Sequence, residues 1–138
     1  MRRLLPTVLL LNLGGCSLIM PSPDPDQAWI DLDPPQRHAL QATRVDRQPL
    51  QDDRYFQVTP GNHELEVRFS FDVDGDDIGP QREPMTRTCL LKLDYPEFTA
   101  GQRYQLKAGG IGFRPWARLY SEDNREVARA RESRCGDV

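Results

Sequence analysis

The densest set of side chains that could do chemistry is a run of carboxylates near the middle of the chain. Asp72, Asp74, Asp76 and Asp77 fall within six residues, and oxygen ligands at that density suit calcium. The run does not fit an EF-hand loop, because Asp77 occupies the sixth position, where the sharp turn requires glycine. A solvated hairpin loop explains these acids without an ion, and the sequence favours it. We expect no cofactor and no other metal.

A second group of side chains follows a pair of glycines. The segment Gly109–Trp116 carries Phe113, Arg114 and Trp116, and we expect a flexible loop. It lacks the lysine and hydroxyl residue of a phosphate loop. Exposed aromatics and arginine would suit contact with a partner. The alternative, which the sequence favours, is that Phe113 and Trp116 close one end of the domain.

The third candidate is the arginine-rich segment from Arg114 to Arg134. Guanidinium groups bind phosphates and carboxylates well. Acidic residues are interleaved with these arginines, however, which indicates surface ion pairs of small value. We favour the ion pairs.

Catalysis has little support in the sequence. The chain has two histidines, His38 and His63, and hydrogen bonding to the backbone of a turn explains His63. A glycosidase requires only two carboxylates, so composition alone does not exclude one. We nevertheless expect no enzyme, because a small domain with short loops offers little cleft.

The elements that carry these residues are predicted by alternation of apolar and polar side chains. The pattern is clearest from Glu64 to Val73, where every second residue is apolar and one face of a strand is therefore buried. Weaker runs extend over residues 29–32, 40–45, 54–58, 88–95, 103–108, 116–121 and 126–130. The last of these is alternatively part of a short helix over residues 125–134, which are rich in helix formers.

Turn signals separate the predicted strands and indicate the fold class. They include Pro60-Gly61-Asn62, Asp74-Gly75-Asp76, Ala100-Gly101-Gln102, Gly109-Gly110 and Glu122-Asp123-Asn124. Short strands with frequent turns predict an all-β fold, a small antiparallel β-sandwich or barrel.

The first sixteen residues have the form of an export signal. Met1-Arg2-Arg3 precedes an apolar run from Leu4 to Leu13 and the sequence Leu13-Gly14-Gly15-Cys16. An apolar run of about ten residues is too short for a membrane helix, which needs roughly twenty. One interpretation is an ordinary secretory signal peptide that has a cysteine nearby by chance.

Leu13-Gly14-Gly15-Cys16 resembles the lipobox of bacterial lipoproteins. The resemblance implies cleavage before Cys16, lipid on its thiol and, with three acyl chains, permanent attachment to a membrane. Ser17, rather than aspartate, implies sorting to the outer membrane, with the domain facing the periplasm. The expected organisation is a signal peptide at 1–15, a lipidated proline-rich tether at 16–26 and a sandwich domain at 27–138. The ten tether residues from Ser17 to Asp26 would span up to roughly 30 Å.

Loss of the leader changes the charge and the cysteine count. Removing Arg2 and Arg3 leaves 16 basic and 21 acidic residues, a net charge of −5, so nucleic acid is not an expected partner. Cys89 and Cys135 remain as an even pair in an oxidising compartment, which predicts a disulfide between them. Two buried free thiols are the alternative.

Further motifs carry a second resemblance. Val45-Asp46-Arg47-Gln48 and the later Pro60-Gly61-Asn62-His63 before a strong alternating strand resemble PEGA-type β-sandwich modules and a group of small proteobacterial lipoproteins. The resemblance implies an Ig-like sandwich and no active site. Arg47 stands where such modules often have glycine, which leaves the type of the first turn open.

Together these features predict a non-catalytic, membrane-anchored envelope lipoprotein whose domain binds another envelope protein or cell-wall component. A calcium- or small-ligand-binding module is the alternative, and a cell-wall hydrolase a more distant one.

Overall fold

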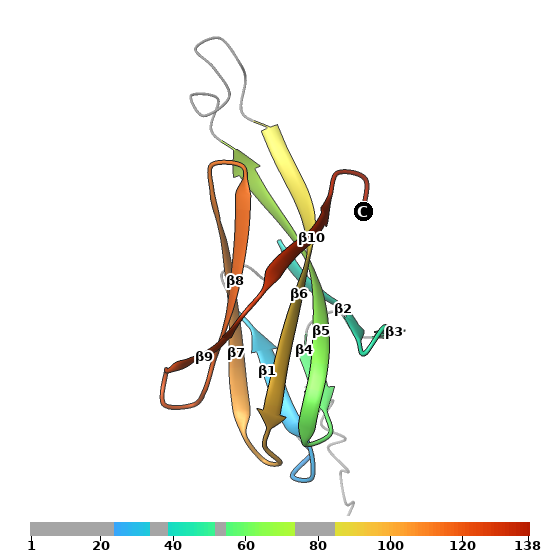
Figure 1. Ribbon diagram of the computed structural model, residues 1–138, viewed down its shortest axis with the longest axis vertical. Coiled ribbons are helices and arrows are strands. Elements are labelled where there is room, and N and C mark those ends of the chain that lie inside the picture. The colour runs from blue at the N-terminus through green and yellow to red at the C-terminus, as the bar shows by residue number, and fades with distance from the viewer. Residues whose placement is uncertain (1–23, 34–38, 52–54, 74–84) are drawn as a thin grey trace, which may run out of the picture.

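The described part of the chain folds into ten strands arranged in two sheets (Figure 1). The computed structural model describes residues 24–33, 39–51, 55–73 and 85–138. Sheet A has the order β4-β1-β7-β8-β9, and sheet B has the order β10-β6-β5-β2-β3. The strands are β1 (Ala28–Leu32), β2 (Leu40–Val45), β3 (Gln48–Pro49), β4 (Tyr55–Val58), β5 (Gly61–Val73), β6 (Met85–Phe98), β7 (Arg103–Ile111), β8 (Arg114–Tyr120), β9 (Glu126–Arg129) and β10 (Arg131–Cys135).

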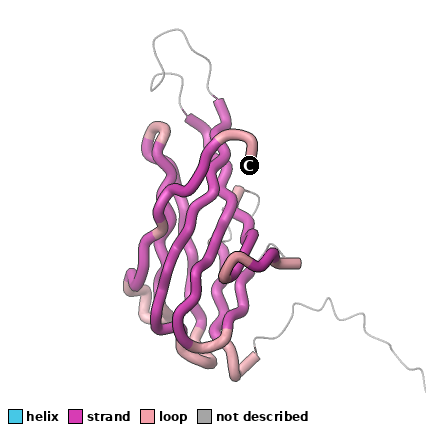
Figure 2. The backbone as a smooth tube through the Cα atoms, turned by 45° about the vertical axis from the view of Figure 1, so that its right-hand side comes forward, coloured by secondary structure: helices cyan, strands magenta, loops and turns pink. Residues whose placement is uncertain are grey.

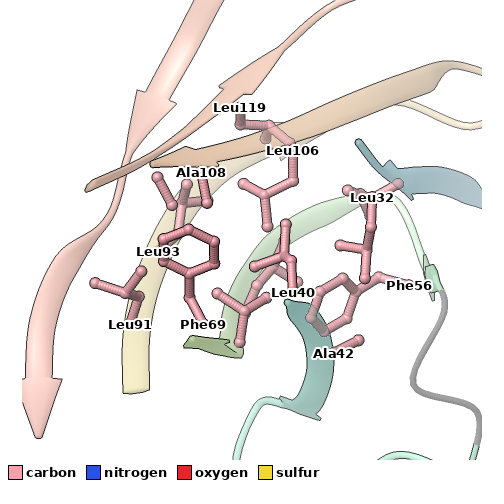
Figure 3. Close-up of a cluster of buried hydrophobic side chains, with 14 of the residues drawn as sticks. Leu32, Leu40, Ala42, Phe56, Phe69, Leu91, Leu93, Leu106, Ala108 and Leu119 are labelled. Carbon is pink, nitrogen blue, oxygen red and sulfur yellow. The ribbon is translucent and has the colours of Figure 1, made fainter. Parts of the chain in front are cut away.

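The two sheets form the layers of a small β-sandwich, as the alternation predicted (Figure 2). Most strands turn apolar residues inward, and both layers contribute to one core. Figure 3 shows Leu106 and Leu119 of sheet A facing Phe69 and Leu93 of sheet B, with Phe56 filling the side nearer β2. Burial of these side chains is the main source of stability, at about 25 cal/mol per Å² of apolar surface.

The strand pairings are antiparallel with one exception. β1 pairs with β7 in parallel, with Trp29 beside Arg103 and Leu32 beside Leu106. β5 and β6 form the longest ladder, from Gly61 beside Phe98 to Val73 beside Met85. The parallel pair departs from the purely antiparallel sandwich that we expected, because periodicity within a strand does not report which strand lies beside it.

The turns explain two of the sequence motifs. Asp46 and Arg47 have φ angles of 49° and 68°, and positive φ at both central residues is the signature of a type I′ hairpin turn. This settles the turn type that Arg47 left open. Gly61, with a φ of 111°, lies at the corner where the chain passes from β4 in sheet A to β5 in sheet B. Pro60-Gly61-Asn62 is therefore a corner between sheets.

The C-terminal segment forms strands, and the helix alternative for residues 125–134 is wrong. β9 pairs with β8 in sheet A, and β10 pairs with β6 in sheet B. The chain changes sheets at Ala130, whose N–H donates to the carbonyl of Ala117 at 2.9 Å. Residues 125–134 have a high helix propensity, but they pair with β8 and β6 instead, because tertiary context overrides propensity.

The residues directly before β1 form a turn. Asp24 to Asp26 form a turn in which the N–H of Gln27 donates to the carbonyl of Asp24 at 3.1 Å. The carbonyl of Gln27 then accepts the N–H of Gly101 at 2.9 Å. Residues 24–26 therefore form a turn rather than the extended conformation that we expected there, and the boundary between tether and domain stays a prediction. The rest of the predicted tether and the signal sequence lie outside the described residues.

No helix that is long and apolar enough to span a membrane occurs in the described parts of the chain.

Candidate partner-contact surface

The predicted loop from Gly109 to Trp116 is a β-hairpin. β7 and β8 pair from Gln105 beside Tyr120 to Ile111 beside Arg114, which leaves Gly112 and Phe113 as a two-residue turn. Gly112 has a φ of 58°, the conformation that glycine supplies at the first central position of a type II′ turn. Gly109 and Gly110 lie in β7, so the turn predicted there is wrong. We call Ile111 to Arg114 the hairpin tip.

Strand alternation decides which hairpin side chains can meet a partner. Leu106, Ala108, Ala117 and Leu119 point inward and are buried. The outward residues of the same strands are Arg103, Gln105, Lys107, Gly109, Ile111, Arg114, Trp116, Arg118 and Tyr120. The outer face of sheet A is therefore a polar and aromatic surface with few strongly apolar side chains.

Trp116 lies flat on the outer face of this hairpin. A Cβ atom on its cross-strand neighbour Gly109 would come within 2.5 Å of the indole ring, so glycine makes room for the ring. The guanidinium of Arg118 lies 4.9 Å from the ring centroid on the same strand. Trp116 therefore does not close an end of the sandwich, which was the favoured interpretation of the sequence.

The hairpin tip carries exposed apolar side chains. Ile111 is 73% exposed and Phe113 is 38% exposed, and Met85 at the start of β6 is 47% exposed. The guanidinium of Arg87 lies 5.7 Å from the centroid of the Phe113 ring. Phe113 and Arg114 are thus accessible to a partner, as one interpretation of the sequence held. Sequence reasoning missed Ile111, although its place in the alternation of β7 directs it outward.

Register brings three cations together next to the tip. Lys107 of β7 lies beside Arg118 of β8, and Arg118 lies beside Arg129 of β9. Glu126 is the carboxylate paired with this row, at 3.7 Å from Arg118 and 2.5 Å from Arg129. The hydrogen bond from Arg129 lowers the pKa of Glu126, against a smaller opposing effect of burial. We call Lys107, Arg118 and Arg129 the cation row.

The predicted ion pairs of the arginine-rich segment are present, in the cation row and also on sheet B. Arg131 of β10 lies 2.7 Å from Asp94 and 3.3 Å from Glu64. Hydrogen bonding and the charge of Asp94 raise the pKa of Arg131. Arg114 makes no ion pair with another described residue. Among the described residues, the segment is therefore paired over part of its length, and Arg114 at the hairpin tip is the end that has no carboxylate partner.

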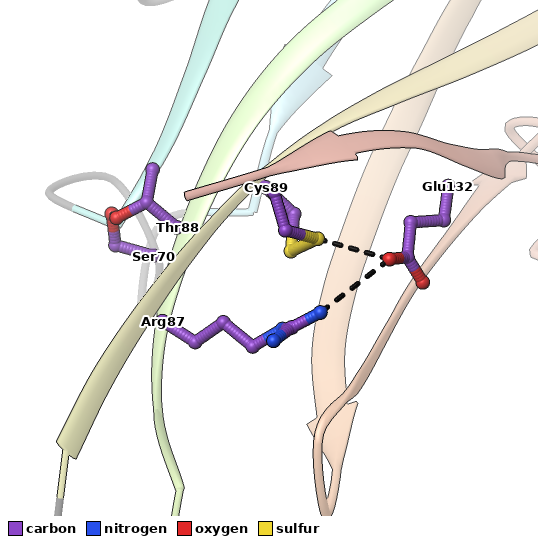
Figure 4. Close-up of a disulfide and its surroundings, with 6 residues drawn as sticks. Ser70, Arg87, Thr88, Cys89 and Glu132 are labelled. Carbon is purple, nitrogen blue, oxygen red and sulfur yellow. Dashed lines mark hydrogen bonds and ion pairs between the residues drawn. A yellow bond between two sulfur atoms is a disulfide. The ribbon is translucent and has the colours of Figure 1, made fainter. Parts of the chain in front are cut away.

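The predicted disulfide between Cys89 and Cys135 is present, with an S–S distance of 2.04 Å (Figure 4). The two cysteines are direct cross-strand neighbours on β6 and β10. Glu132 Oε1 lies 3.0 Å from the sulfur of Cys135 and 3.6 Å from a guanidinium nitrogen of Arg87. Two cysteines and a carboxylate resemble a metal-ligand set, but the sulfurs are bonded to each other and offer no thiolate.

Asp46, His63 and Thr59 are arranged like a catalytic triad, although their contacts indicate a structural role. His63 Nδ1 lies 2.5 Å from Asp46 Oδ2, and Nε2 lies 3.0 Å from the Thr59 hydroxyl. Nε2 also lies 2.7 Å from the Thr59 carbonyl. A carbonyl accepts only, so Nε2 carries the proton there and is unable to take one from the hydroxyl. The predicted backbone hydrogen bond of His63 is confirmed.

The same contacts stabilise the carboxylate of Asp46. Burial raises its pKa, but the N–H of Glu64 and the ring of His63 together outweigh this effect and lower it below the usual value. Asp46 thereby joins the β2–β3 turn to the start of β5. His38 lies outside the described residues.

A shallow groove of about 420 Å³ lies beside the β6–β7 and β8–β9 turns. It is lined in part by Tyr95, Tyr104, Ser121, Glu122 and Arg125. Burial raises the pKa of Tyr95, and the nearby hydroxyl of Tyr104 adds to this. Arg125 makes no ion pair with another described residue, so the groove offers a small polar ligand one guanidinium and two phenol groups, beside the carboxylates of Glu122 and Asp123.

The calcium candidates fall mostly beyond the described part of the chain. Asp72 is exposed on β5 and accepts a hydrogen bond from the Thr86 hydroxyl at 2.9 Å. Asp74, Asp76 and Asp77 lie outside the described residues. Asp72 alone does not make a site.

Comparison with known proteins gives no relative for this chain, because no family model, no curated protein and no solved structure matches it.

Proposed function

We propose that this chain is a lipid-anchored protein of the bacterial cell envelope whose β-sandwich binds another envelope component and catalyses no reaction. The observation that carries the proposal is the Cys89–Cys135 disulfide. Such bridges form and persist in oxidising compartments outside the cytoplasm. With these two cysteines bonded, Cys16 is the single thiol left for lipid.

The position of β1 supports an anchored arrangement. β1 begins at Ala28 and runs parallel to β7, with Trp29 beside Arg103. The hairpin tip lies at the far end of β7 (Figure 1). The segment that carries Cys16 would therefore join the domain at the end opposite the tip, which keeps Phe113 and Arg114 away from the point of attachment.

Mass spectrometry of the N-terminal peptide from membrane fractions tests the anchor. We expect a mature chain that begins at Cys16 and carries a diacylglycerol thioether and an amide-linked acyl chain. A Cys16→Ser variant should lose the lipid and accumulate with its leader uncleaved. An N-terminus at another residue, or an unmodified Cys16, would contradict the anchor.

In-cell cross-linking followed by mass spectrometry tests the binding role. We expect a Phe113→Ala, Arg114→Ala variant to fold normally and to lose most of its cross-linked partner. A Lys92→Ala, Arg134→Ala variant changes two residues of sheet B and should retain the partner. Equal loss in both variants, or release of muropeptides from purified cell wall by the wild-type protein, would count against a non-catalytic contact at the tip.

The groove beside Tyr95 and Arg125 favours one second candidate, a small-ligand-binding module. Its volume of about 420 Å³ is within the ordinary range of ligand sites, roughly 300–1,000 Å³. A ligand that binds the folded state raises the melting temperature, so a thermal-shift screen of small carboxylates and phosphates tests it. A shift should disappear in Arg125→Ala and persist in Arg134→Ala.

A further inference from the structure

The outer face of sheet A has the opposite charge to the rest of the protein. Its strands present five cations, Arg103, Lys107, Arg114, Arg118 and Arg129, and two carboxylates, Asp31 and Glu126. The net charge of this face is +3, while the whole chain has a net charge of −3. On the outer face of sheet B, Glu64 and Asp94 both pair with Arg131, and Arg44 lies 4.0 Å from Glu66.

The cation row concentrates this charge over three adjacent strands. Like charges directly opposite each other destabilise a sheet, and Glu126 compensates only one of the three cations in the row. Lys107 lies 5.0 Å from the centroid of the Tyr120 ring, which holds it in place without neutralising it. The row is thus a fixed positive strip that attracts an anionic surface.

Apolar and aromatic side chains flank the row on the same face. Ile111 projects from the tip end and is 73% exposed, Trp116 lies between the tip and the row, and Tyr120 lies on its other side. Peripheral membrane-binding surfaces have this composition. Their cations contact lipid phosphates, their aromatic side chains lie at the boundary between head groups and acyl chains, and an aliphatic side chain enters the acyl layer.

We propose that the outer face of β7, β8 and β9 lies against a bilayer surface that contains anionic lipid, with the cation row on lipid phosphates and Ile111 inserted among the acyl chains. This deepens the proposed function, on which it rests for the location of the protein beside a membrane. The outer face of sheet A has an excess of three positive charges, whereas Arg44 and Arg131 of sheet B pair with carboxylates of that sheet, so the charged face also sets the orientation of the domain.

Lipid fits this surface better than an anionic glycan does. Sugars stack on open aromatic faces, but the Trp116 ring has Gly109 beneath it and Arg118 within 4.9 Å. Lys107 similarly lies over Tyr120. A glycan would leave Ile111 in water, whereas a bilayer buries it.

The chain geometry permits this contact. β1, where the N-terminal segment enters the domain, belongs to the same sheet and pairs directly with β7. An anchor attached ahead of β1 therefore reaches the membrane from the edge of the face that we propose to lie on it.

Vesicle flotation of residues 16–138 carrying Cys16→Ser tests the face without the anchor. All described core residues lie between Ala28 and Cys135, so this fragment contains the whole sandwich. We expect it to bind vesicles of phosphatidylcholine and phosphatidylglycerol at 70:30 at least tenfold more tightly than pure phosphatidylcholine vesicles. Binding should fall at least tenfold when NaCl is raised from 50 to 500 mM, because salt screens the charges.

Matched charge reversals locate the binding surface. Lys107→Glu with Arg129→Glu reverses two charges of the cation row, changes the face from +3 to −1 and should reduce binding at least tenfold. Lys92→Glu with Arg134→Glu makes the same net change on sheet B and should alter binding less than twofold. Ile111→Ser should weaken binding severalfold with the salt dependence unchanged.

Equal effects of the two reversals, or equal binding to both vesicle types, would overturn the proposal. So would retention on an anionic polysaccharide with no vesicle binding, which would assign the face to a glycan instead. These outcomes are independent of the lipid on Cys16, since the fragment lacks it. If the fragment does not bind vesicles, the proposal of a lipid anchor on Cys16 is unaffected. If Cys16 proves to be unmodified in cells, the result of the vesicle experiment is unaffected.

Discussion

At the scale of single residues, the two adjacent glycines of β7 make room for an aromatic ring on each face of the strand. Gly109 points outward under the ring of Trp116, and Gly110 points inward, where a Cβ would overlap the ring of Phe71 from sheet B. The sequence indicates a turn at such a pair. The glycines instead allow two aromatic rings to approach the strand closely, Trp116 at Gly109 and Phe71 at Gly110. The sequence does not predict these contacts, because they depend on strand pairing and on the packing of the two sheets.

Replacing Gly110 by alanine should therefore destabilise the domain more than replacing Gly109. Phe71 is buried and has to shift within the core, and overpacking of this kind costs about 1–3 kcal/mol. Trp116 lies on the surface and can swing into solvent, so we expect Gly109→Ala to cost less than about 1 kcal/mol. Urea unfolding of both variants measures the difference, and a larger cost at Gly109 would show that Trp116 is held more firmly than its position indicates.

The Asp46–His63 pair makes a prediction about pH. The folded-state pKa of Asp46 is lowered, so its contribution is present above the unfolded pKa of about 3.9 and is lost as the pH falls through the folded value. Half of the Asp46 side chain is exposed, so solvent screens the pair and the contribution is modest. Asn is the suitable replacement because it tolerates the positive φ at this position.

Melting curves at several pH values test this contribution. Wild type should be more stable than Asp46→Asn at pH 6, and the gap should narrow as the pH is lowered to about 3. A gap that stays constant over this range would mean that Asn disturbs the turn itself and that the charge of Asp46 contributes nothing.

At the scale of elements, β10 depends on the disulfide more than any other strand does. It is a sheet edge whose first four residues, Arg131 to Arg134, are all exposed, so burial of apolar side chains provides little to hold it. Cys135 is bonded to Cys89, which is fully buried in β6. The bridge therefore fixes an edge strand that its own sequence would not fix.

Replacing both cysteines by alanine should cost about 4 kcal/mol, which the chain-entropy model gives for a separation of 46 residues. Urea unfolding of the variant measures this loss, and the wild-type protein in reducing agent is the matched control. Amide exchange should show β10 opening before β5 and β6 do. A loss below about 1 kcal/mol would mean that pairing with β6 already holds the strand.

The elements also show how far the sequence alone could predict this fold. Alternation located β2 and most of β5, because one face of each strand is buried in the core. It failed for β10, where no residue before Cys135 is buried. Among the site residues, Phe113 and Arg114 could be predicted as contact candidates, because aromatic and arginine side chains are common in interfaces. The cation row was missed because Lys107, Arg118 and Arg129 meet only through strand register.

At the scale of the whole molecule, the proposals assign different physical forces to the two attachments. The acyl chains on Cys16 would hold through the hydrophobic effect, which salt does not weaken, since each buried methylene contributes about 0.8 kcal/mol. The outer face of sheet A would hold through charge, which acts over only about 3 Å at 1 M salt. The anchor therefore decides whether the protein stays on a membrane, and the face decides how the domain lies there.

Salt washing of membranes should separate the two attachments in the full-length protein. In 1 M NaCl the chain should stay in the membrane fraction while protease gains access to β7 and β8. The outer face of sheet A should dissociate from the bilayer at this salt concentration, whereas the lipid on Cys16 should stay inserted. Detergent should release the chain fully. With Lys107→Glu and Arg129→Glu, the same protease sites should be accessible already at low salt, whereas Lys92→Glu and Arg134→Glu should behave as wild type. Complete release of the wild-type chain by salt would mean that charge alone attaches it and that Cys16 carries no lipid.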